Sequence, residues 1–306
     1  MKRWAPFAMV CLLAGGALVM SQRRRATADV GPYAILHFIA DTEREASRLP
    51  FELTRLSDEE EIRIGDELAG GYLRSAARQP GSGDAEVQAY VERVGRTVAG
   101  RAHRQLPYRF HYLPDAGFVN AFALPGGHVF IGRGLLAMMD TEDQLAGVLG
   151  HETAHIDRYH CAERVQTEAH LRKLQLGVLA SLVQIPIVVF QAGYSKNQEL
   201  EADRVGLELA ARANCSPLGM IRLFEKFQAA VAKSRGPAST PEEEAARVVF
   251  QTMGGYFRSH PYPDERIVEM RRLVAQNGWE NRTTERPLSI WALLQPEKKE
   301  AATPTR

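Results

Sequence analysis

The sequence predicts an α+β fold, a mostly helical domain that carries one small β-sheet. Two observations support this class. Patterns that cap the start of a helix occur at four places, and the chain between the second and third of them is rich in aromatic and β-branched residues. Helices, strands and again helices follow one another in blocks, which argues against alternating βαβ units. The four predicted helix starts are Ser57, Asp84, Thr141 and Ser195.

The first two predicted helices precede the sheet. Ser57-Asp58-Glu59-Glu60 is a capping box, in which the Ser and Glu side chains satisfy each other's backbone N–H groups, and its helix should extend to about Ala77. Pro80-Gly81-Ser82-Gly83 ends that helix. We expect Asp84 to cap the second helix. One apolar stripe on this helix is formed by Val87, Val91, Val94 and Val98.

Two runs should form the sheet. Residues 108–113 alternate in polarity and are rich in aromatic side chains. His128-Val129-Phe130-Ile131 is a short β-prone run with glycine-containing turns on both sides. Such turns are typical of an edge strand, so we predict that residues 128–131 form the edge of the sheet. Two capping boxes then begin the next helices, at Thr141 and at Ser195.

Other segments suggest how the chain is divided. Residues 174–195 carry no charge but include Gln and Pro, so we expect a buried or membrane-touching helical hairpin, with a true membrane span as the alternative. Residues 233–245 should form a mobile loop, and residues after 295 should be disordered. We therefore expect one domain over 29–275 and an extension, partly disordered, over 276–306.

The amino-terminal 28 residues predict export. Lys2 and Arg3 precede an uncharged run over 4–20, and small residues at 26–28 suit a signal peptidase. Three arginines at 23–25 lie where a cleaved signal rarely has charge. Residues 1–28 are therefore either a cleaved signal peptide or a retained anchor.

Composition is that of a globular protein, with 45% hydrophobic and 25% charged residues. Five of the 38 basic residues lie in the amino-terminal segment, so the rest of the chain is mildly acidic against its 37 Asp and Glu. This balance gives no electrostatic reason to expect nucleic acid as a partner. Cys161 and Cys215 either pair or remain buried thiols, and spacing alone leaves both options open.

His151-Glu152-Thr153-Ala154-His155 predicts a catalytic metal site. Residues four apart lie on one face of a helix, so both imidazoles can point at one ion. Glu152 is close enough to take a proton from water on that ion without binding the metal itself. Apolar Leu145, Val148 and Leu149 precede the motif on a core-packed helix, which argues against two incidental surface histidines. These ligands suit one Zn²⁺.

The third ligand must come from elsewhere in the chain. A metzincin histidine would fall at Cys161, one residue beyond His160, and the glycine of that motif is missing. Glu199 and Asp203 are better candidates, because they lie four apart on a helix. One carboxylate can bind zinc while the other accepts the remaining N–H of a ligand imidazole. We interpret Glu201 as part of a solvated acidic face, and we expect Ala202 and Gly206 to allow close helix packing.

These residues resemble a known family. His151 to His155, followed by Glu199-x-x-Ala202-Asp203, is similar to the gluzincin peptidases of the CAAX prenyl protease and HtpX family, above all their exported Oma-like and BepA-like bacterial members. Further stretches match at 120–131, at 134–136 and at Ser259-His260-Pro261 with Arg266. The resemblance covers about residues 56–266, and it implies that Glu199 is the zinc ligand and Asp203 its supporting residue.

The family also implies roles that spacing does not give. The equivalent of His260 lies over the zinc in relatives, where it either stabilises an oxyanion or occupies the open position as a plug. Arg266 would be a supporting cation or a surface ion pair. The strand at 128–131 would pair with an extended peptide across the zinc. In that arrangement, His128, Val129 and Phe130 would line the cleft.

The resemblance implies a zinc-dependent endopeptidase that hydrolyses misfolded or unassembled proteins of the bacterial envelope, in the periplasm or on the periplasmic face of the membrane. Contact with a membrane surface would fit that location. The alternative is a zinc-containing, chaperone-like binding protein whose cleft is plugged. Glu152 favours the enzyme, because a binding protein has no use for a general base.

Overall fold

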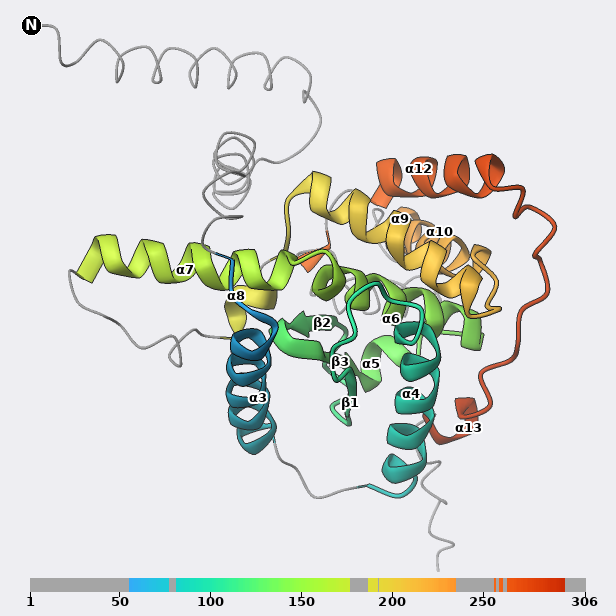
Figure 1. Ribbon diagram of the computed structural model, residues 1–306. Coiled ribbons are helices and arrows are strands. Elements are labelled where there is room, and N and C mark those ends of the chain that lie inside the picture. Colours follow the sequence, from blue (N-terminus) through green and yellow to red (C-terminus); the bar gives the residue numbers. More distant parts are fainter. Residues whose placement is uncertain are drawn as a thin grey trace, which may run out of the picture. The chain divides into compact units, whose positions relative to one another are not determined.

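Helices surround a small mixed sheet in this protein (Figure 1). The computed structural model describes residues 55–76, 81–176, 187–191, 193–234, 256, 259–260 and 263–294. All of them belong to one compact unit of the chain, which extends from Ser47 to Arg306. The predicted α+β class is confirmed.

In the sequence, two of the longer helices, α3 and α4, precede the sheet, and the other helices follow it. The helices are α3 (Asp58–Ser75), α4 (Asp84–Ala99), α5 (Arg133–Leu136), α6 (Glu142–Asp157), α7 (His160–Leu176), α8 (Val188–Gln191), α9 (Lys196–Arg212), α10 (Leu218–Ser234), α12 (Pro263–Gln276) and α13 (Trp291–Leu294).

Three of the four predicted helix starts are capped by the predicted residue. Ser57 and Ser195 each form a complete capping box, with the side chain and backbone bonds both present. Thr141 accepts a bond from the Gln144 N–H, but Gln144 bonds the backbone of residue 140 in return. The prediction for Asp84 was wrong. Asp84 is the first residue of α4, and its carboxylate accepts a bond from the N–H of Gly81 instead.

The sheet contains the strands β1 (Arg109–Leu113), β2 (Ala121–Leu124) and β3 (His128–Gly132). Their order is β1-β3-β2, with β1 parallel and β2 antiparallel to β3. The predicted edge strand is therefore the central strand, and this expectation was wrong. Both sides of β3 are already paired, so β3 has no free edge to offer an added strand.

A tight turn joins β2 to β3 and depends on glycine. Residues 125–127 form a short 3₁₀ turn in which Gly126 and Gly127 have φ values of 74° and 112°. A Cβ atom on Gly126 would lie 2.5 Å from the carbonyl oxygen of Glu61, in α3. Only glycine fits both the backbone conformation and the contact. The turn therefore packs the backbone between β2 and β3 directly against α3.

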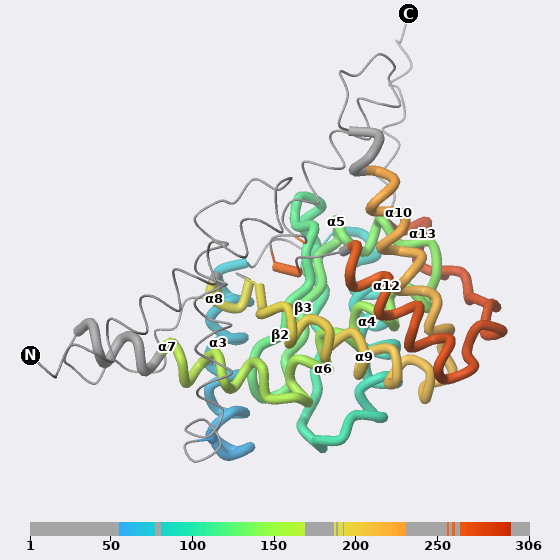
Figure 2. The backbone as a smooth tube through the Cα atoms, turned by 90° about the horizontal axis from the view of Figure 1, so that it is seen from above, coloured from blue at the N-terminus to red at the C-terminus, as the bar shows by residue number. Residues whose placement is uncertain are grey.

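Helix α6 lies at the centre of the packing, and all of its residues are buried. It contacts β2, α4, α9 and α10, and α12 packs beside α9 and α10 (Figure 2). The contact between α6 and α9 is close because it involves glycine. A Cβ atom on Gly206 would lie 2.7 Å from the backbone nitrogen of His151. This agrees with the expectation that small residues bring the two helices together.

Several predictions fall outside the residues that the structure describes. They are the export segment at 1–28, residues 177–186 and 192 of the uncharged run at 174–195, the loop at 233–245 beyond its first residues, and the carboxyl-terminal residues after 294. Among the described residues, no helix combines the length and apolar character needed to cross a membrane. Cys161 and Cys215 are both buried and free.

Candidate metal centre

Helix α6 supplies the three residues of the sequence motif. Its first turn contains Glu142 and Asp143, whose charges complement the positive end of the helix dipole. His151 and His155 follow on one face, and their Nε2 atoms lie 3.1 Å apart. Both side chains are fully buried. Glu152, also fully buried, is the next residue round the helix from His151.

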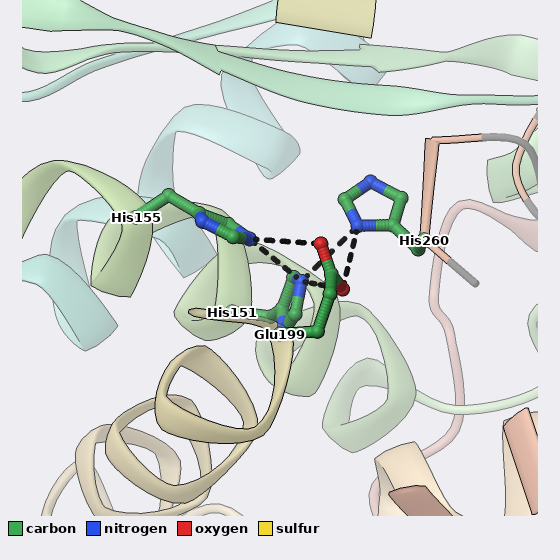
Figure 3. Close-up of side chains that lie close together, drawn as sticks. All are labelled: His151, His155, Glu199 and His260. Carbon is green, nitrogen blue, oxygen red and sulfur yellow. Dashed lines mark hydrogen bonds and ion pairs between the residues drawn. The ribbon is translucent and has the colours of Figure 1, made fainter. Parts of the chain in front are cut away.

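Helix α9 brings a carboxylate to the two imidazoles. Glu199 lies in its first turn, directly after the capping box at Ser195. Its Oε2 is 3.4 Å from His151 Nε2, and its Oε1 is 3.7 Å from His155 Nε2. Figure 3 shows the carboxylate beside both rings, on the side that faces His260. The structure therefore brings together the three residues that the sequence proposed as ligands.

His260 joins this group from a distant part of the chain. Its Nδ1 lies 3.2 Å from His151 Nε2 and 3.2 Å from Glu199 Oε2 (Figure 3). One ligand atom from each of His151, His155, Glu199 and His260 lies within 4.8 Å of the others. On its other side, His260 Nε2 is 3.3 Å from Glu152 Oε1. His260 thus lies between the candidate ligands and the candidate general base.

Asp203 and Arg266 support the group from behind. Asp203 Oδ1 lies 2.9 Å from His151 Nδ1, the ring nitrogen that faces away from the other candidate ligands. The Arg266 guanidinium donates two hydrogen bonds to Asp203, of 2.6 and 2.7 Å, and its Nη1 is 2.9 Å from Glu199 Oε2. Arg266 is 1% exposed, so the alternative of a surface ion pair is excluded.

The chemistry of these residues fits a divalent cation. Three buried carboxylates, Glu152, Glu199 and Asp203, face one buried guanidinium. Among the described residues, no hydrogen bond reaches Oε1 of Glu199 or either oxygen of Glu152, and Glu152 Oε1 lies 3.3 Å from His260 Nε2. Uncompensated buried acceptors are costly. A cation bound by imidazole nitrogens and a carboxylate would compensate them.

The pKa values agree with that fit. Burial raises the pKa of Glu152. Burial would also raise the pKa of Glu199, but His260 and Arg266 hold it well below its usual range. Burial and Arg266 oppose a charge on His151, yet the carboxylates of Asp203 and Glu199 raise its pKa to about 9. The cluster therefore favours positive charge beside these carboxylates. Burial keeps the pKa of His155 well below its usual value, as a neutral ligand requires.

Two residues that the sequence did not assign to the site lie one behind the other on the Nδ1 side of His155. His160 is 2% exposed, and its Nδ1 is 3.0 Å from His155 Nδ1. Glu201 is near both His160 and Arg158, which lower the pKa of its carboxyl to about 2. Its side chain is 25% exposed, so the face that Glu201 forms is only partly solvated. The ring of Tyr194 stacks on His155, with centroids 3.9 Å apart.

His128, expected in the cleft wall, has its hydrogen-bond contacts elsewhere. Its ring nitrogens lie 2.9 Å from His111 Nε2 and 2.9 Å from Asp66 Oδ1, on β1 and α3. The other two residues of that expectation, Val129 and Phe130, are buried in the core of the sheet. The proposed peptide contacts of 128–131 are not available, because β1 and β2 occupy both sides of the strand.

The strand beside the candidate ligands is β2, which was not among the strands predicted from the sequence. His260 Nε2 lies 3.4 Å from the carbonyl oxygen of Ala121. The backbone N–H of Ala121 donates to the side-chain oxygen of Asn120, which also accepts a bond from the Ser259 hydroxyl. The segment that carries His260 is thereby attached to the start of β2.

Comparison with known proteins shows that the chain is similar to peptidases. Residues 82–274 match peptidase family M48. A putative beta-barrel assembly-enhancing protease of Vibrio cholerae is 27% identical over 244 residues, which are 72% of this chain and 45% of the relative. The mitochondrial metalloendopeptidase OMA1 of Schizosaccharomyces pombe is 30% identical over 218 residues, 69% of this chain and 60% of the relative.

A human relative extends the comparison. The mitochondrial metalloendopeptidase OMA1 of Homo sapiens is 27% identical over 208 residues, 62% of this chain and 36% of the relative. The chain spans about half the length of the curated relatives it matches.

Proposed function

This chain belongs to peptidase family M48, and from that premise we propose that it is a zinc-dependent endopeptidase of envelope proteins. Family membership and the metalloendopeptidase relatives make it a metalloprotease that acts on protein or peptide substrates. One observation carries the finer proposal. The ligand atoms of His151, His155, Glu199 and His260 converge within 4.8 Å, with the buried carboxylate of Glu152 beside them, 3.3 Å from His260.

In the proposed metal site, His151, His155 and Glu199 would hold one Zn²⁺. Asp203 would support His151, and Arg266 would support Glu199 and Asp203. When bound, zinc would polarise the scissile carbonyl and lower the pKa of water. Glu152 accepts the proton of the attacking water and returns it to the leaving amine. Its burial raises its pKa, so the carboxyl can hold that proton between the two steps.

We propose that His260 acts as a plug in this arrangement. Its Nδ1 lies among the candidate ligands, and its Nε2 faces Glu152 and the Ala121 carbonyl oxygen. All four members of the group are at most 2% exposed. A protein substrate therefore requires that His260 move away, after which the outer side of β2 could pair with an extended peptide.

The proposed substrates are misfolded or unassembled envelope proteins. The name of the Vibrio cholerae relative, beta-barrel assembly-enhancing protease, supports this class. The basic and apolar amino-terminal segment supports export to the periplasm or its membrane face, where contact with a membrane surface would follow. Sequencing the amino terminus of the purified protein tests export: Asp29 as the first residue indicates a cleaved signal, and Met1 indicates an anchor.

The test of catalysis is digestion of casein by the purified full-length chain, with zinc content measured alongside. Glu152→Gln should retain about one zinc but lose at least ~100-fold in rate, because the amide cannot accept the proton. Glu208→Gln, the same change on the exposed side of α9, is the control and should keep full activity. Full activity in the Glu152→Gln variant would contradict the assignment.

The position of His260 also favours a second function, a zinc-containing binding or chaperone-like protein with a shut site. His260→Ala separates the two. If His260 is a plug on a protease, its replacement raises the rate of casein digestion. If it stabilises the oxyanion, the rate falls. A variant that binds zinc and prevents aggregation of unfolded protein, yet cleaves nothing, would support the binding function.

A further inference from the structure

The two candidate histidine ligands are held by different partners. His151 points its Nδ1 at a carboxylate, Asp203, at 2.9 Å. His155 points its Nδ1 at another imidazole, His160, at 3.0 Å. Both rings direct Nε2 toward Glu199 (Figure 3). The partner of His151 is the kind expected behind a ligand imidazole, whereas the partner of His155 can accept or donate a hydrogen and so needs an explanation.

The single N–H of a neutral imidazole determines which ring is the donor in the contact between His155 and His160. A neutral imidazole carries one N–H, and a ligand nitrogen must keep its lone pair free for the metal. His155 therefore carries its hydrogen on Nδ1 and donates it to His160 Nδ1. The hydrogen of His160 is then on Nε2, which lies 3.4 Å from Glu201 Oε2. Glu201 is the last acceptor in this series of hydrogen bonds. Its Oε1 also accepts a hydrogen bond from Arg158 Nε at 2.8 Å.

The backbone is bent so that this contact forms. Helix α6 ends at Asp157 and α7 begins at His160. Between them, Tyr159 adopts a φ of 64°, a left-handed conformation that costs a non-glycine residue energy. The Arg104 guanidinium lies over the Tyr159 ring at 3.9 Å and helps to hold it. This reversal brings the first residue of α7 back onto the ring of His155.

We propose that His160, backed by Glu201, is a positioning residue for the metal centre. It holds His155 in the Nδ1–H tautomer and fixes the direction of its Nε2 atom. Tyr194, stacked on the same ring, restricts the ring plane but offers no acceptor to Nδ1 through its face. The inference rests on the proposed role of His155 as a zinc ligand.

The primary experiment measures zinc affinity of the full-length chain by competition with a chelator. His160→Phe removes the acceptor and should weaken zinc binding about 10- to 100-fold, the usual effect of losing a residue behind a ligand. His160→Asn places an amide oxygen near the position of Nδ1 and should restore affinity to within a few-fold of wild type. Circular dichroism melting of each metal-free variant checks that it folds.

Two further variants test Glu201 without altering a buried ring. Glu201→Gln weakens the support of His160 and should reduce zinc affinity less than His160→Phe does. Glu208→Gln, the matched control, makes the same change at an exposed glutamate of α9 and should leave zinc affinity unchanged. Selective ¹⁵N labelling of histidine gives a readout independent of metal. His155 should carry its proton on Nδ1 in the metal-free wild type and lose that preference in His160→Phe.

The outcomes separate this inference from the function on which it rests. If His155→Ala binds zinc as tightly as wild type, His155 is no ligand and the proposed function fails as well. If His155→Ala weakens zinc binding but folded His160→Phe does not, only the role of His160 is overturned. Equal effects of Glu201→Gln and Glu208→Gln on zinc affinity would overturn the role of Glu201.

Discussion

Two buried arginines show how differently one protein can use the same charge. Arg104 is 5% exposed and Arg266 is 1% exposed. Arg104 bonds both oxygens of Glu61, the carbonyl oxygen of Ile156 and the carboxylate of Asp58, and so joins α3 to the end of α6. Arg266 bonds Asp203 and Glu199 beside the candidate ligands.

The clusters around Arg104 and Arg266 differ in which buried polar atoms lack a hydrogen bond. Among the described residues, both oxygens of Glu61 beside Arg104 accept a hydrogen bond, and the Nε of Arg104 has no acceptor. Beside Arg266, by contrast, three carboxylate oxygens of Glu152 and Glu199 have no hydrogen bond from the described residues. The first cluster is neutralised from within the chain. The second is electron-rich and suited to a cation from outside.

The largest expected effect concerns the first cluster. Arg104→Met should lower the free energy of unfolding by about 3–5 kcal/mol, because Glu61 would remain buried without its partner. The loss should be the same with and without zinc, as measured by urea denaturation. Arg96→Met removes an exposed ion pair with Glu92 and should change stability by less than about 0.5 kcal/mol. A zinc-dependent loss in Arg104→Met would contradict the comparison.

Zinc should act on the second cluster alone. Free zinc at a hundred times its Kd should raise the free energy of unfolding of wild type by about 2.7 kcal/mol. The same concentration should raise that of Glu199→Gln by less than about 1 kcal/mol, because a ligand is lost. Denaturation curves at several zinc concentrations provide the measurement. Equal stabilisation of both proteins would mean that zinc binds elsewhere.

The smallest effect compares the two complete capping boxes. Ser57→Ala and Ser195→Ala should each cost about 1 kcal/mol of stability, because each loses a helix cap. Only Ser195→Ala should also weaken zinc binding, by a few-fold, since Glu199 lies in the first turn of α9. Melting curves and chelator competition on both variants separate the two effects. A matching loss of zinc affinity in Ser57→Ala would show that the cap acts through global stability.

Much of this arrangement could be predicted from the sequence. Capping boxes at Ser57 and Ser195 gave correct helix starts, because their side-chain bonds are local and need no tertiary information. The family resemblance is confirmed by the match over 82–274. Helical spacing placed His151 and His155 on one face, and the family resemblance implied Glu199 as the third ligand. The structure does bring the three residues together.

The sheet was harder to predict, for physical reasons. Strand β2 is four residues long and buried on both faces, so it has neither the length nor the alternation that identifies a strand. Strand order depends on tertiary packing, which turn residues beside β3 do not encode. The prediction for Asp84 was wrong because Gly83, with a φ of 81°, takes the position before α4 and leaves the Asp84 side chain to bond Gly81.

His160 and Glu201 were set aside for a related reason. Their contact with His155 depends on the reversal at Tyr159, and helical periodicity does not extend across a helix end. Two signals were present in the sequence: a histidine five residues after His155, and a glutamate two residues after Glu199. Neither signal indicates a contact with His155, because that contact forms only when the chain reversal and α9 bring His160 and Glu201 together.

The glycine contact between α6 and α9 has a consequence for how the protein can vary. With no side chain between Gly206 and the backbone of His151, the separation of the two helices is determined by main-chain atoms. Rotamer exchange on the outer faces of α6 and α9 therefore leaves the distance between their metal-facing atoms unchanged. The outer faces are free to diverge in composition. Position 206 is not, since a single methyl group there would displace the α9 carboxylate from both imidazoles at once.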